Sequence, residues 1–530
     1  MLPASSAAAT ATRGLPPVRR GLTAPLQERL AQLRGWRADI AAMLAGAVSA
    51  AALPPVFALP VLLVCIPVLL ILIAAAPRPL VAARRGFFFG FGLNLIGLYW
   101  ITEAILFEAA RFWWLVPLAV PALAAVLAVF IAIPAGIARL FRPGASTALA
   151  LAGTWGLADL ARQFVATGFP WNPLGSVWEF PGHPGDVMIQ PASLVGVHGL
   201  TVVTLLLAAT PLLNWRWRSA GLALLVAWCG FGIWRLDQPI PPGPDVKVLL
   251  IQGNVAQGQK WNRSLMVAIF RHYLALTRQA VQAADGHPAI VVWPETASPA
   301  LLQTDTEARR LIAEAAGGNQ ALIGSVRFDT EDRPRNSLFA LGAGGTIEGI
   351  YDKWHLVPFG EYQPDWLPLG IQVVPGGGFA AGTGPQTLHL PGLPPVGALI
   401  CYEAIFPAQV IDSADRPAWM INVTNDAWFG NSTGPRQHLA AARLRAVEEG
   451  LPLLRAANTG ISAAFDARGH EIARLGMQKS GFLPINLPGP LEPTLFSRFG
   501  LLLPASICAV VVCGAFLCIR PKRARGEFKI

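Results

Sequence analysis

The chain has 530 residues, of which 53% are hydrophobic and 14% are charged, a composition that excludes a single ordinary soluble domain. Its formal net charge of +10 comes from basic residues between and beside apolar segments, where they act as membrane-topology signals. No basic stripe with interleaved aromatic residues occurs in the more polar part of the chain, so no nucleic-acid partner is expected.

Residues 1–38 are rich in alanine, proline and arginine. They contain no compact apolar core followed by a small-residue cleavage site, which a signal peptide requires. We therefore expect a cytoplasmic N-terminal extension.

Residues 39–236 contain seven apolar runs, and residues 500–519 contain an eighth. Each is close to the ~20 residues that cross a ~30 Å hydrocarbon layer, although the first run is short. Pro54-Pro55 separates the first two runs, because proline breaks a helix. The sequence predicts eight transmembrane helices, at about 40–53, 57–77, 87–107, 113–138, 146–165, 188–213, 219–234 and 501–519.

The distribution of Lys and Arg predicts the orientation of these helices. Connections after the second, fourth and sixth runs are basic, whereas those after the first, third and fifth are poorer in positive charge; Arg235 is a mild exception. With a cytoplasmic N-terminus, eight spans return the basic tail, 520–530, to the cytoplasm and place residues 245–490 outside it. The residues that carry this bias are Arg78, Arg84, Arg85, Arg139, Arg142, Arg216 and Arg218.

The segment PIPPGP (239–244) marks the start of a second region, 245–490, with ordinary charge content. Buried-strand and amphipathic-helix patterns alternate along it, which indicates α/β layers. Helices are predicted near 263–284, 305–317 and 435–449. Strands are predicted near 246–255, 289–297, 321–328, 337–342, 346–351, 396–401, 418–423, 453–457, 461–466 and 482–486.

Three residues of this region stand at the ends of buried runs. Glu295 lies in WPETA, Lys353 lies in YDKWHLVPFGEY, and Cys401 is the one cysteine outside the strongly apolar segments. Singly, each has a plain structural explanation: a helix cap, a solvated lysine and a packed thiol. Jointly they predict a cluster on one rim of the sheets. A thiol with a pKa near ~8.5 needs a base or a cation beside it to react at neutral pH.

WPETA, YDKWHLVPFGEY and ICYEAIFP resemble the three motifs of the nitrilase superfamily, which implies an αββα sandwich with a Glu-Lys-Cys triad. NDAWFG (425–430) and GPRQHLAAARLRAVE narrow the resemblance to the apolipoprotein N-acyltransferase family of the bacterial inner membrane. That family is also an eight-span protein with a periplasmic nitrilase-like domain before its last span. The resemblance covers most of the chain, with residues 1–38 as an extension.

The resemblance implies that Glu295 is the general base, Lys353 the oxyanion stabiliser and Cys401 the nucleophile. It also implies supporting roles for Glu361, Tyr402 and Glu403, for which a purely structural role is the alternative. The implied reaction moves an acyl chain from a phospholipid, with the sn-1 chain of phosphatidylethanolamine expected, to a thioester on the cysteine. The acyl chain then passes to the α-amino group of a lipoprotein's diacylglyceryl-cysteine, without a cofactor.

Further residues are candidates for shaping the cleft. Trp261 and the apolar, glycine-rich stretch 366–379 are predicted to form a lid towards the lipid. Asn425, Trp428 and His438 are substrate or lid candidates inside the family motifs. The histidines of this region lack the close spacing of a zinc site, so no metal is expected. Two other functions stay open: a membrane-tethered amidase with the same triad, and a non-catalytic lipid-binding protein that kept the fold.

Overall fold

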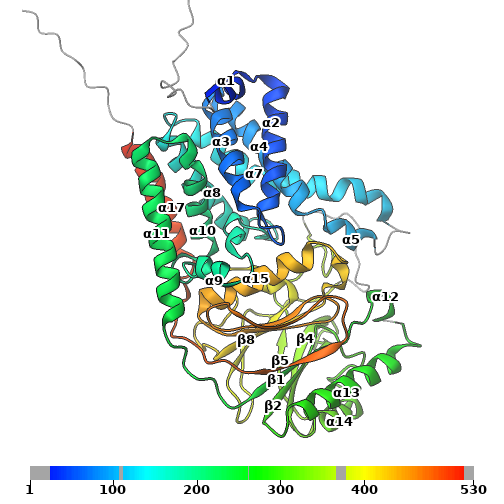
Figure 1. Ribbon diagram of the computed structural model, residues 1–530. Coiled ribbons are helices and arrows are strands. Elements are labelled where there is room, and N and C mark those ends of the chain that lie inside the picture. Colours follow the sequence, from blue (N-terminus) through cyan, green and yellow to red (C-terminus); the bar gives the residue numbers. More distant parts are fainter. Residues whose placement is uncertain (1–23, 107–111, 261, 366–377, 519–530) are drawn as a thin grey trace, which may run out of the picture.

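The computed structural model describes residues 24–106, 112–260, 262–365 and 378–518 (Figure 1). A region of long helices stands on an α/β domain built from two sheets. Trp261, most of the predicted lid, the first 23 residues and the predicted basic tail lie outside the described residues.

The helical region is held together by close helix crossings. α4 packs against α2 and α7, and α8 packs against α10 and α17, which comes from the far end of the sequence. At the α2–α4 crossing, a Cβ on Gly46 would stand 1.9 Å from the carbonyl oxygen of Phe89, so only glycine permits this approach. The helices are α1 (Ala24–Gln32), α2 (Gly35–Ser49), α3 (Leu62–Ala74), α4 (Pro79–Gly97), α5 (Ile101–Leu106), α7 (Val116–Ala138), α8 (Ala145–Arg162), α9 (His183–Ile189), α10 (Ala192–Ala209), α11 (Trp215–Asp237) and α17 (Leu502–Leu517).

Each predicted apolar run overlaps one of these helices. Within the described residues, three helical stretches are long and apolar enough to cross a membrane: Trp113–Ala138, Ala192–Leu212 and Trp215–Asp237. Leu59–Ala74 and Leu502–Leu517 are apolar but shorter. The chain therefore has a membrane-type helical region, and the count of eight spans stays a prediction.

The third predicted run needs a correction. α4 begins at Pro79 and ends at Gly97, whereas the sequence pattern predicted a helix over 87–107. Proline favours the first turn of a helix, so α4 starts before its apolar stretch and includes two arginines that were assigned to a connection. Arg84 forms an ion pair with Asp39 at 3.2 Å. Arg85 is buried and donates a hydrogen bond to the carbonyl oxygen of Leu72.

The α/β domain contains two six-stranded sheets, in the orders β12-β1-β2-β3-β4-β5 and β11-β10-β9-β8-β7-β6. All ten predicted strands are present. The exposed β11 and the short β6 were not predicted. The first sheet comprises β1 (Lys247–Gln252), β2 (Ala289–Trp293), β3 (Gln320–Phe328), β4 (Pro334–Leu341), β5 (Ile347–Asp352) and β12 (Gly481–Asn486). The second comprises β6 (Thr387–Leu388), β7 (Val396–Ile400), β8 (Trp419–Thr424), β9 (Leu453–Ala457), β10 (Ser462–Phe465) and β11 (Glu471–Leu475).

Side-chain alternation along the strands explains the layers. Val248 and Leu250 of β1 pack into the core between the two sheets, whereas Leu249 and Ile251 pack on the helices outside. Helices α13 (Met266–Ala283) and α14 (Thr306–Ala315) cover the first sheet, and α15 (Gly434–Glu449) covers the second. The four layers therefore follow the order helices, sheet, sheet, helix, which is the predicted αββα sandwich. Two short helices, α12 (Gln257–Lys260) and α16 (Leu495–Phe499), complete the domain.

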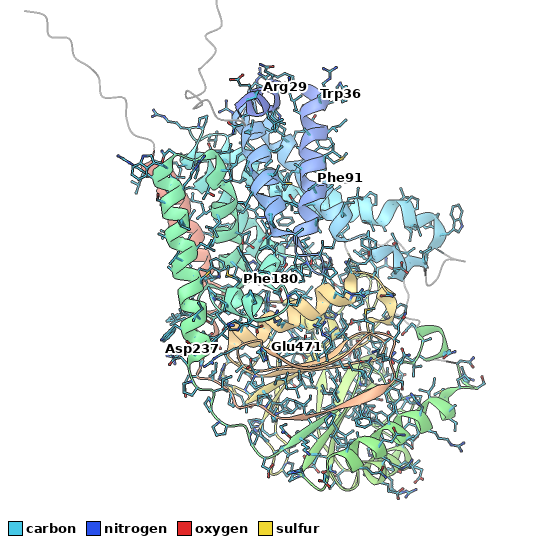
Figure 2. All side chains as sticks on the ribbon, in the orientation of Figure 1. Arg29, Trp36, Phe91, Phe180, Asp237 and Glu471 are labelled. Carbon is cyan, nitrogen blue, oxygen red and sulfur yellow. The ribbon has the colours of Figure 1, made fainter. Side chains whose placement is uncertain are left out.

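Helix α15 lies between the second sheet and the helical region (Figure 1). Its residues Leu439 and Ala442 pack on the sheet, whereas Leu444 and Val447 pack against α9, α10 and α11. Nearly every residue of α15 is buried as a result. In Figure 2, Phe180 and Glu471 mark this junction, far from Arg29 and Trp36 at the other end of the helical region.

The aromatic segment 168–180 belongs to the same junction. Its sequence, GFPWNPLGSVWEF, is rich in aromatic, proline and glycine residues and predicts an interfacial loop near the lipid headgroups. Trp171 is instead buried, and its indole N–H donates to Oε1 of Gln437 on α15 at 2.8 Å. The segment covers part of the α/β domain, because its aromatic side chains pack on an apolar surface that includes Ile405 and Phe406.

Candidate active site

Cys401 stands on a sharp turn at the end of the buried strand β7. Its φ is +52°, in the left-handed region that a residue with a Cβ rarely adopts. Three hydrogen bonds hold the turn. The backbone N–H of Ile400 donates to the carboxylate of Glu403 at 2.6 Å. The carbonyl oxygen of Cys401 accepts from Asn422 Nδ2 at 3.3 Å and from His438 Nε2 at 2.9 Å.

Glu295 and Lys353 meet just beyond the ends of β2 and β5. Lys353 Nζ lies 3.2 Å from Glu295 Oε1 and 2.9 Å from Glu361 Oε1. Asn336 Nδ2 bridges the same two carboxylates, at 2.7 Å and 3.0 Å. The backbone N–H of Asn425 donates to Glu295 Oε2 at 2.9 Å. All of these side chains are buried, so their positions are fixed by direct contacts between protein groups.

The charges of this cluster support one another. Burial raises the pKa of Glu295, but the ammonium groups of Lys353 and Lys260 outweigh burial, and the net shift is downward. Burial lowers the pKa of Lys353, but Glu295 and Glu361 outweigh it and raise the pKa above its usual value. The carboxylate is therefore ionised and the ammonium is charged.

The Cys401 thiol behaves differently from the expectation. A neighbouring cation such as Lys353 is expected to favour the thiolate, but burial raises the pKa of Cys401 well above the ordinary value, and the charge of Glu295 raises it further. Lys353 opposes this shift only in part. The resting site thus holds a protonated thiol beside an ionised carboxylate, because a second anion in this buried cluster is unfavourable.

Two of the three predicted supporting residues lie next to the cluster. Glu361 accepts from Lys353, as described, and from the backbone N–H of Val357 at 2.8 Å. Glu403 accepts from the backbone N–H of Ile400 and Trp354, and from the hydroxyl of Tyr351 at 2.8 Å. Burial raises the pKa of Glu403 to about 7. Glu403 thereby joins the turn that carries Cys401 to the segment that carries Lys353.

Tyr402, the third predicted supporting residue, has its side chain directed towards the helical region. Its hydroxyl donates to the carbonyl oxygen of Gly168 at 3.0 Å, and its ring packs near Phe169 and Phe406. The residue next to the thiol is therefore an anchor between the α/β domain and the aromatic segment 168–180.

Sequence reasoning missed Lys260, which lies on α12. Its ammonium donates to the carbonyl oxygen of Glu295 at 3.0 Å and contacts the hydroxyl of Thr296. Burial lowers the pKa of Lys260 to about 8, against the raising effect of the charge on Glu295 and of Cys401 when it is ionised. A lysine in a short polar segment gives no signal in the sequence. Lys260 and Glu295 are 35 residues apart in the chain, so only folding brings them into contact.

The substrate or lid candidates have different places. Asn425 is buried and donates to Gln257 Oε1 at 2.7 Å, so it fixes α12 to the site. Trp428 is partly buried in a short 3-10 turn, Asp426–Phe429. His438 is buried behind the Cys401 turn, where it contacts the Cys401 carbonyl group. Trp261 lies outside the described residues.

Among the described residues, Cys401, Asp426 and His438 have ligand-type atoms within 4.8 Å of one another. Arg455 already places a positive charge there, with Nη2 at 2.7 Å from Asp426 Oδ2 and 3.0 Å from His438 Nδ1. A metal ion would be repelled by this guanidinium, and His438 Nε2 is engaged with a carbonyl oxygen. This donor set does not fit a metal site.

Comparison with known proteins identifies the domain and then the chain. Residues 251–487 match the carbon-nitrogen hydrolase family, and with the two-sheet fold and the buried cysteine they define an enzyme of the nitrilase superfamily. Residues 45–210 match the apolipoprotein N-acyltransferase N-terminal domain. The chain belongs to the apolipoprotein N-acyltransferase family, as a membrane protein with several apolar helices.

Two relatives carry that assignment. The apolipoprotein N-acyltransferase of Rhodopseudomonas palustris is 38% identical, over 95% of this chain and 99% of its own. The one from Bradyrhizobium diazoefficiens is 40% identical, over 90% of this chain and 94% of its own. A solved amidase from Nesterenkonia sp. covers 47% of this chain and 93% of its own, with 18% identity and a TM-score of 0.36, too low to carry an argument.

Proposed function

We propose that the chain transfers a fatty acyl chain from a membrane phospholipid, expected to be the sn-1 chain of phosphatidylethanolamine, to the α-amino group of a lipoprotein's diacylglyceryl-cysteine. The observation that carries the proposal is a buried thiol on a left-handed turn whose pKa is shifted by the charges of an ionised Glu295–Lys353 pair. A domain that only bound lipid would gain nothing from this arrangement.

In the first half of the reaction, the sulfur of Cys401 attacks the ester carbonyl carbon, while Glu295 accepts the thiol proton. The negative charge of the tetrahedral intermediate develops on the former carbonyl oxygen, and Lys353 stabilises it. The intermediate collapses to a thioester, and the lysophospholipid alcohol leaves with the proton that Glu295 held.

In the second half, the α-amino group of the lipoprotein attacks the thioester carbon, and Glu295 accepts the amine's proton. Collapse forms the amide and expels the Cys401 sulfur, which takes the proton back from Glu295. The high pKa of the buried thiol makes this return of the proton favourable. Glu361, Asn336 and the backbone N–H of Asn425 hold the base and the cation in place throughout.

The acyl-enzyme can be tested by intact mass after incubation of the purified protein with phospholipid. We expect one acyl adduct in the wild type that hydroxylamine removes, and none in Cys401→Ala. Glu295→Gln, which keeps the shape of the base, should lower the rate of adduct formation at least ~10²-fold. An adduct that persists in Cys401→Ala would contradict the assignment of the nucleophile.

Adding a diacylated lipopeptide separates this function from that of a membrane-tethered amidase. The acyltransferase consumes the adduct and blocks the peptide's free amine. An amidase instead releases free fatty acid or hydrolyses small amides, and leaves the peptide amine titratable.

The proposal includes a position in the bacterial inner membrane, with eight spans and the α/β domain on the periplasmic side. Trp36→Cys and Glu307→Cys, each in a Cys513→Ala background, place exposed thiols at opposite ends of the protein. A membrane-impermeant maleimide applied to spheroplasts should label position 307 and spare position 36. The reverse pattern would overturn the orientation.

A further inference from the structure

The first turn of α15 presents two consecutive side chains in opposite directions. His438 Nε2 lies 2.9 Å from the carbonyl oxygen of Cys401. Gln437 Oε1 accepts from the indole N–H groups of Trp100 and Trp171, at 3.0 Å and 2.8 Å. Gln437 Nε2 lies 3.2 Å from the carbonyl oxygens of Pro54 and Gly97. One residue thus contacts the nucleophile's backbone, and its neighbour contacts the helical region at four points.

The chemistry of the contacts fixes which nitrogen of His438 carries hydrogen. A carbonyl oxygen only accepts, so Nε2 donates to Cys401. Nδ1 lies 3.0 Å from Arg455 Nη2 and 2.9 Å from Asp426 Oδ1. The two Asp426 oxygens already have other donors: Thr424 Oγ1 at 3.1 Å and Arg455 Nη2 at 2.7 Å. A carboxylate oxygen can accept a second hydrogen bond, so Nδ1 either accepts from Arg455 or donates to Asp426 Oδ1, and in both states Nε2 donates to the Cys401 carbonyl oxygen.

The neutral ring, in which Nε2 donates and Nδ1 accepts from Arg455, is favoured by burial. Burial and the charge of Arg455 lower the pKa of His438, although Asp426 and the Cys401 carbonyl group oppose the shift. His438 and Arg455 are buried with Asp426, so solvent does not replace a lost donor easily. Removing the Nε2 donor leaves the Cys401 carbonyl with the longer contact from Asn422 alone among the described hydrogen bonds.

Building on the function proposed above, we propose that His438 is a positioning residue for the nucleophile, and that Gln437 links this positioning to the helical region. The geometry makes α15 the connection between the two. The helical region holds the side chain of Gln437, and Gln437 thereby holds the first turn of α15. His438, on the same turn, then holds the carbonyl group of Cys401, whose backbone is in the left-handed conformation. A displacement of ~1 Å at a reacting atom can cost ~10²-fold in rate.

The first test compares two variants of nearly equal length at one position. His438→Gln keeps an N–H donor near the position of Nε2, and His438→Met removes it. We expect His438→Met to form the acyl-enzyme ~10–100-fold more slowly, with the KM for phospholipid unchanged and the shape of the pH profile retained. His438→Gln should recover most of the rate. Equal rates for Met and wild type, or equal losses for Met and Gln, would overturn the proposal.

The second test is a double-mutant cycle between Gln437→Leu and His438→Met. If both act through one element, the double variant loses less than the product of the two single effects. Independent, multiplicative losses would refute the link to the helical region. Glu448→Gln is the matched control, because its side chain contacts the backbone N–H of Val197 at the other end of α15. Its acylation rate should equal that of the wild type.

If His438→Met does not fold, the Gln437→Leu variant alone still tests the proposal. The Gln437→Leu variant leaves the Asp426–His438–Arg455 contacts intact, and its rate of adduct formation should fall with KM unchanged. These results are also separable from the proposed function. If wild-type protein forms no adduct, the function fails, whereas an adduct formed equally fast by all variants refutes the positioning role alone.

Discussion

Two buried polar clusters of this protein differ in how completely their polar atoms are paired: in the active-site cluster the unpartnered side-chain atom among the described residues is Oδ1 of Asn336. In the active-site cluster, both oxygens of Glu295 and Glu361 accept hydrogen bonds from protein donors. The junction cluster, between α8, α10 and α15, is defined by Asp159, Arg162, Gln163, Ser176, Glu179, His198, Arg445 and Glu448. Each of these has at least one buried polar atom without a hydrogen-bond partner among the described residues.

Charge does not explain the difference, because both clusters are rich in it. Arg162 forms an ion pair with Asp159 at 3.7 Å, and Arg445 Nε lies 3.0 Å from Glu448. The junction carries charges without the hydrogen-bond geometry that makes buried charges favourable. Preorganised contacts are found where charge develops during the reaction, and loosely paired charges are found where two regions of the protein meet. Substitutions should therefore be severe in the active-site cluster and mild or stabilising at the junction.

The largest effect is expected for Lys353→Met. The substitution leaves Glu295 and Glu361 buried without their shared cation, which costs about 3–5 kcal/mol and removes the stabilisation of the oxyanion. Acyl-enzyme formation should fall at least ~10³-fold, and the thermal midpoint in detergent should drop by several degrees. Lys353→Arg keeps the positive charge but not the position of the ammonium group. It should restore more of the thermal midpoint than of the rate of acyl-enzyme formation. A Met variant with wild-type acylation would show that Lys353 belongs to a structural ion pair only.

Lys260 is expected to have a smaller effect that depends on pH. Above its pKa of about 8, wild-type Lys260 loses the charge that faces Glu295 and Cys401. With that loss, less positive charge supports the sulfur and the oxyanion, so the acylation rate should fall as the pH rises through about 8.

Lys260→Arg should shift this decline to higher pH, because a guanidinium stays protonated there. Lys260→Met should be ~10–100-fold slower below pH 8 and should lack the decline. A Met variant whose pH profile matches the wild type would exclude Lys260 from this effect.

The contrast between these two lysines shows what the sequence could predict. Glu295 and Lys353 follow the predicted strands β2 and β5, which run in the same direction, so both strands end at the same edge of the first sheet. Lys260 and Asn336 reach the same cluster from a short helix and from within β4, and nothing in their local sequence predicts the contact. Arg455 did carry a signal, since a charge within an apolar strand is costly unless paired. The protonated state of Cys401 depends on burial, which no spacing of residues reveals.

The same distinction applies to the fold. Most predicted strands are buried apolar runs, although β5 and β12, whose residues are largely half-buried or exposed, were predicted as well. β11, whose residues are alternately half-buried and exposed and include Glu471 and Arg474, was missed. The start of α4 was wrong because apolar periodicity begins later than the helix does. The local sequence pattern predicts where helices and strands lie. The partners of Arg84 and Arg85 on α4 are far away in the sequence and become visible only in the folded structure.

Glu448→Gln probes the junction cluster with a moderate expected effect. Burial raises the pKa of Glu448 from 4.5 to about 7, against the effect of Arg445. A raised folded-state pKa means that the group's contribution is favourable below about pH 4.5 and is lost as the pH rises through about 7. The full contribution of this pKa shift to the free energy of unfolding is about 3 kcal/mol.

Glutamine is neutral at every pH and still accepts from Val197, so Glu448→Gln should be more stable than wild type at pH 8 and similar at pH 5. Thermal midpoints in detergent at the two pH values measure this difference. A variant that loses stability at pH 8 would show that Glu448 acts as a paired anion.

The smallest effect is expected for ion pairs outside both clusters. On α14, Arg310 contacts Glu307 at 2.6 Å and also Glu314, with all three side chains at least half exposed. Solvent and salt screen such pairs, and holding long side chains in one geometry opposes the attraction. Arg310→Ala should leave both the thermal midpoint and the acylation rate unchanged, at low and at high salt. A clear loss at low salt that added salt removes would mean that exposed pairs matter in this domain, and that burial is not what separates its important charges from the rest.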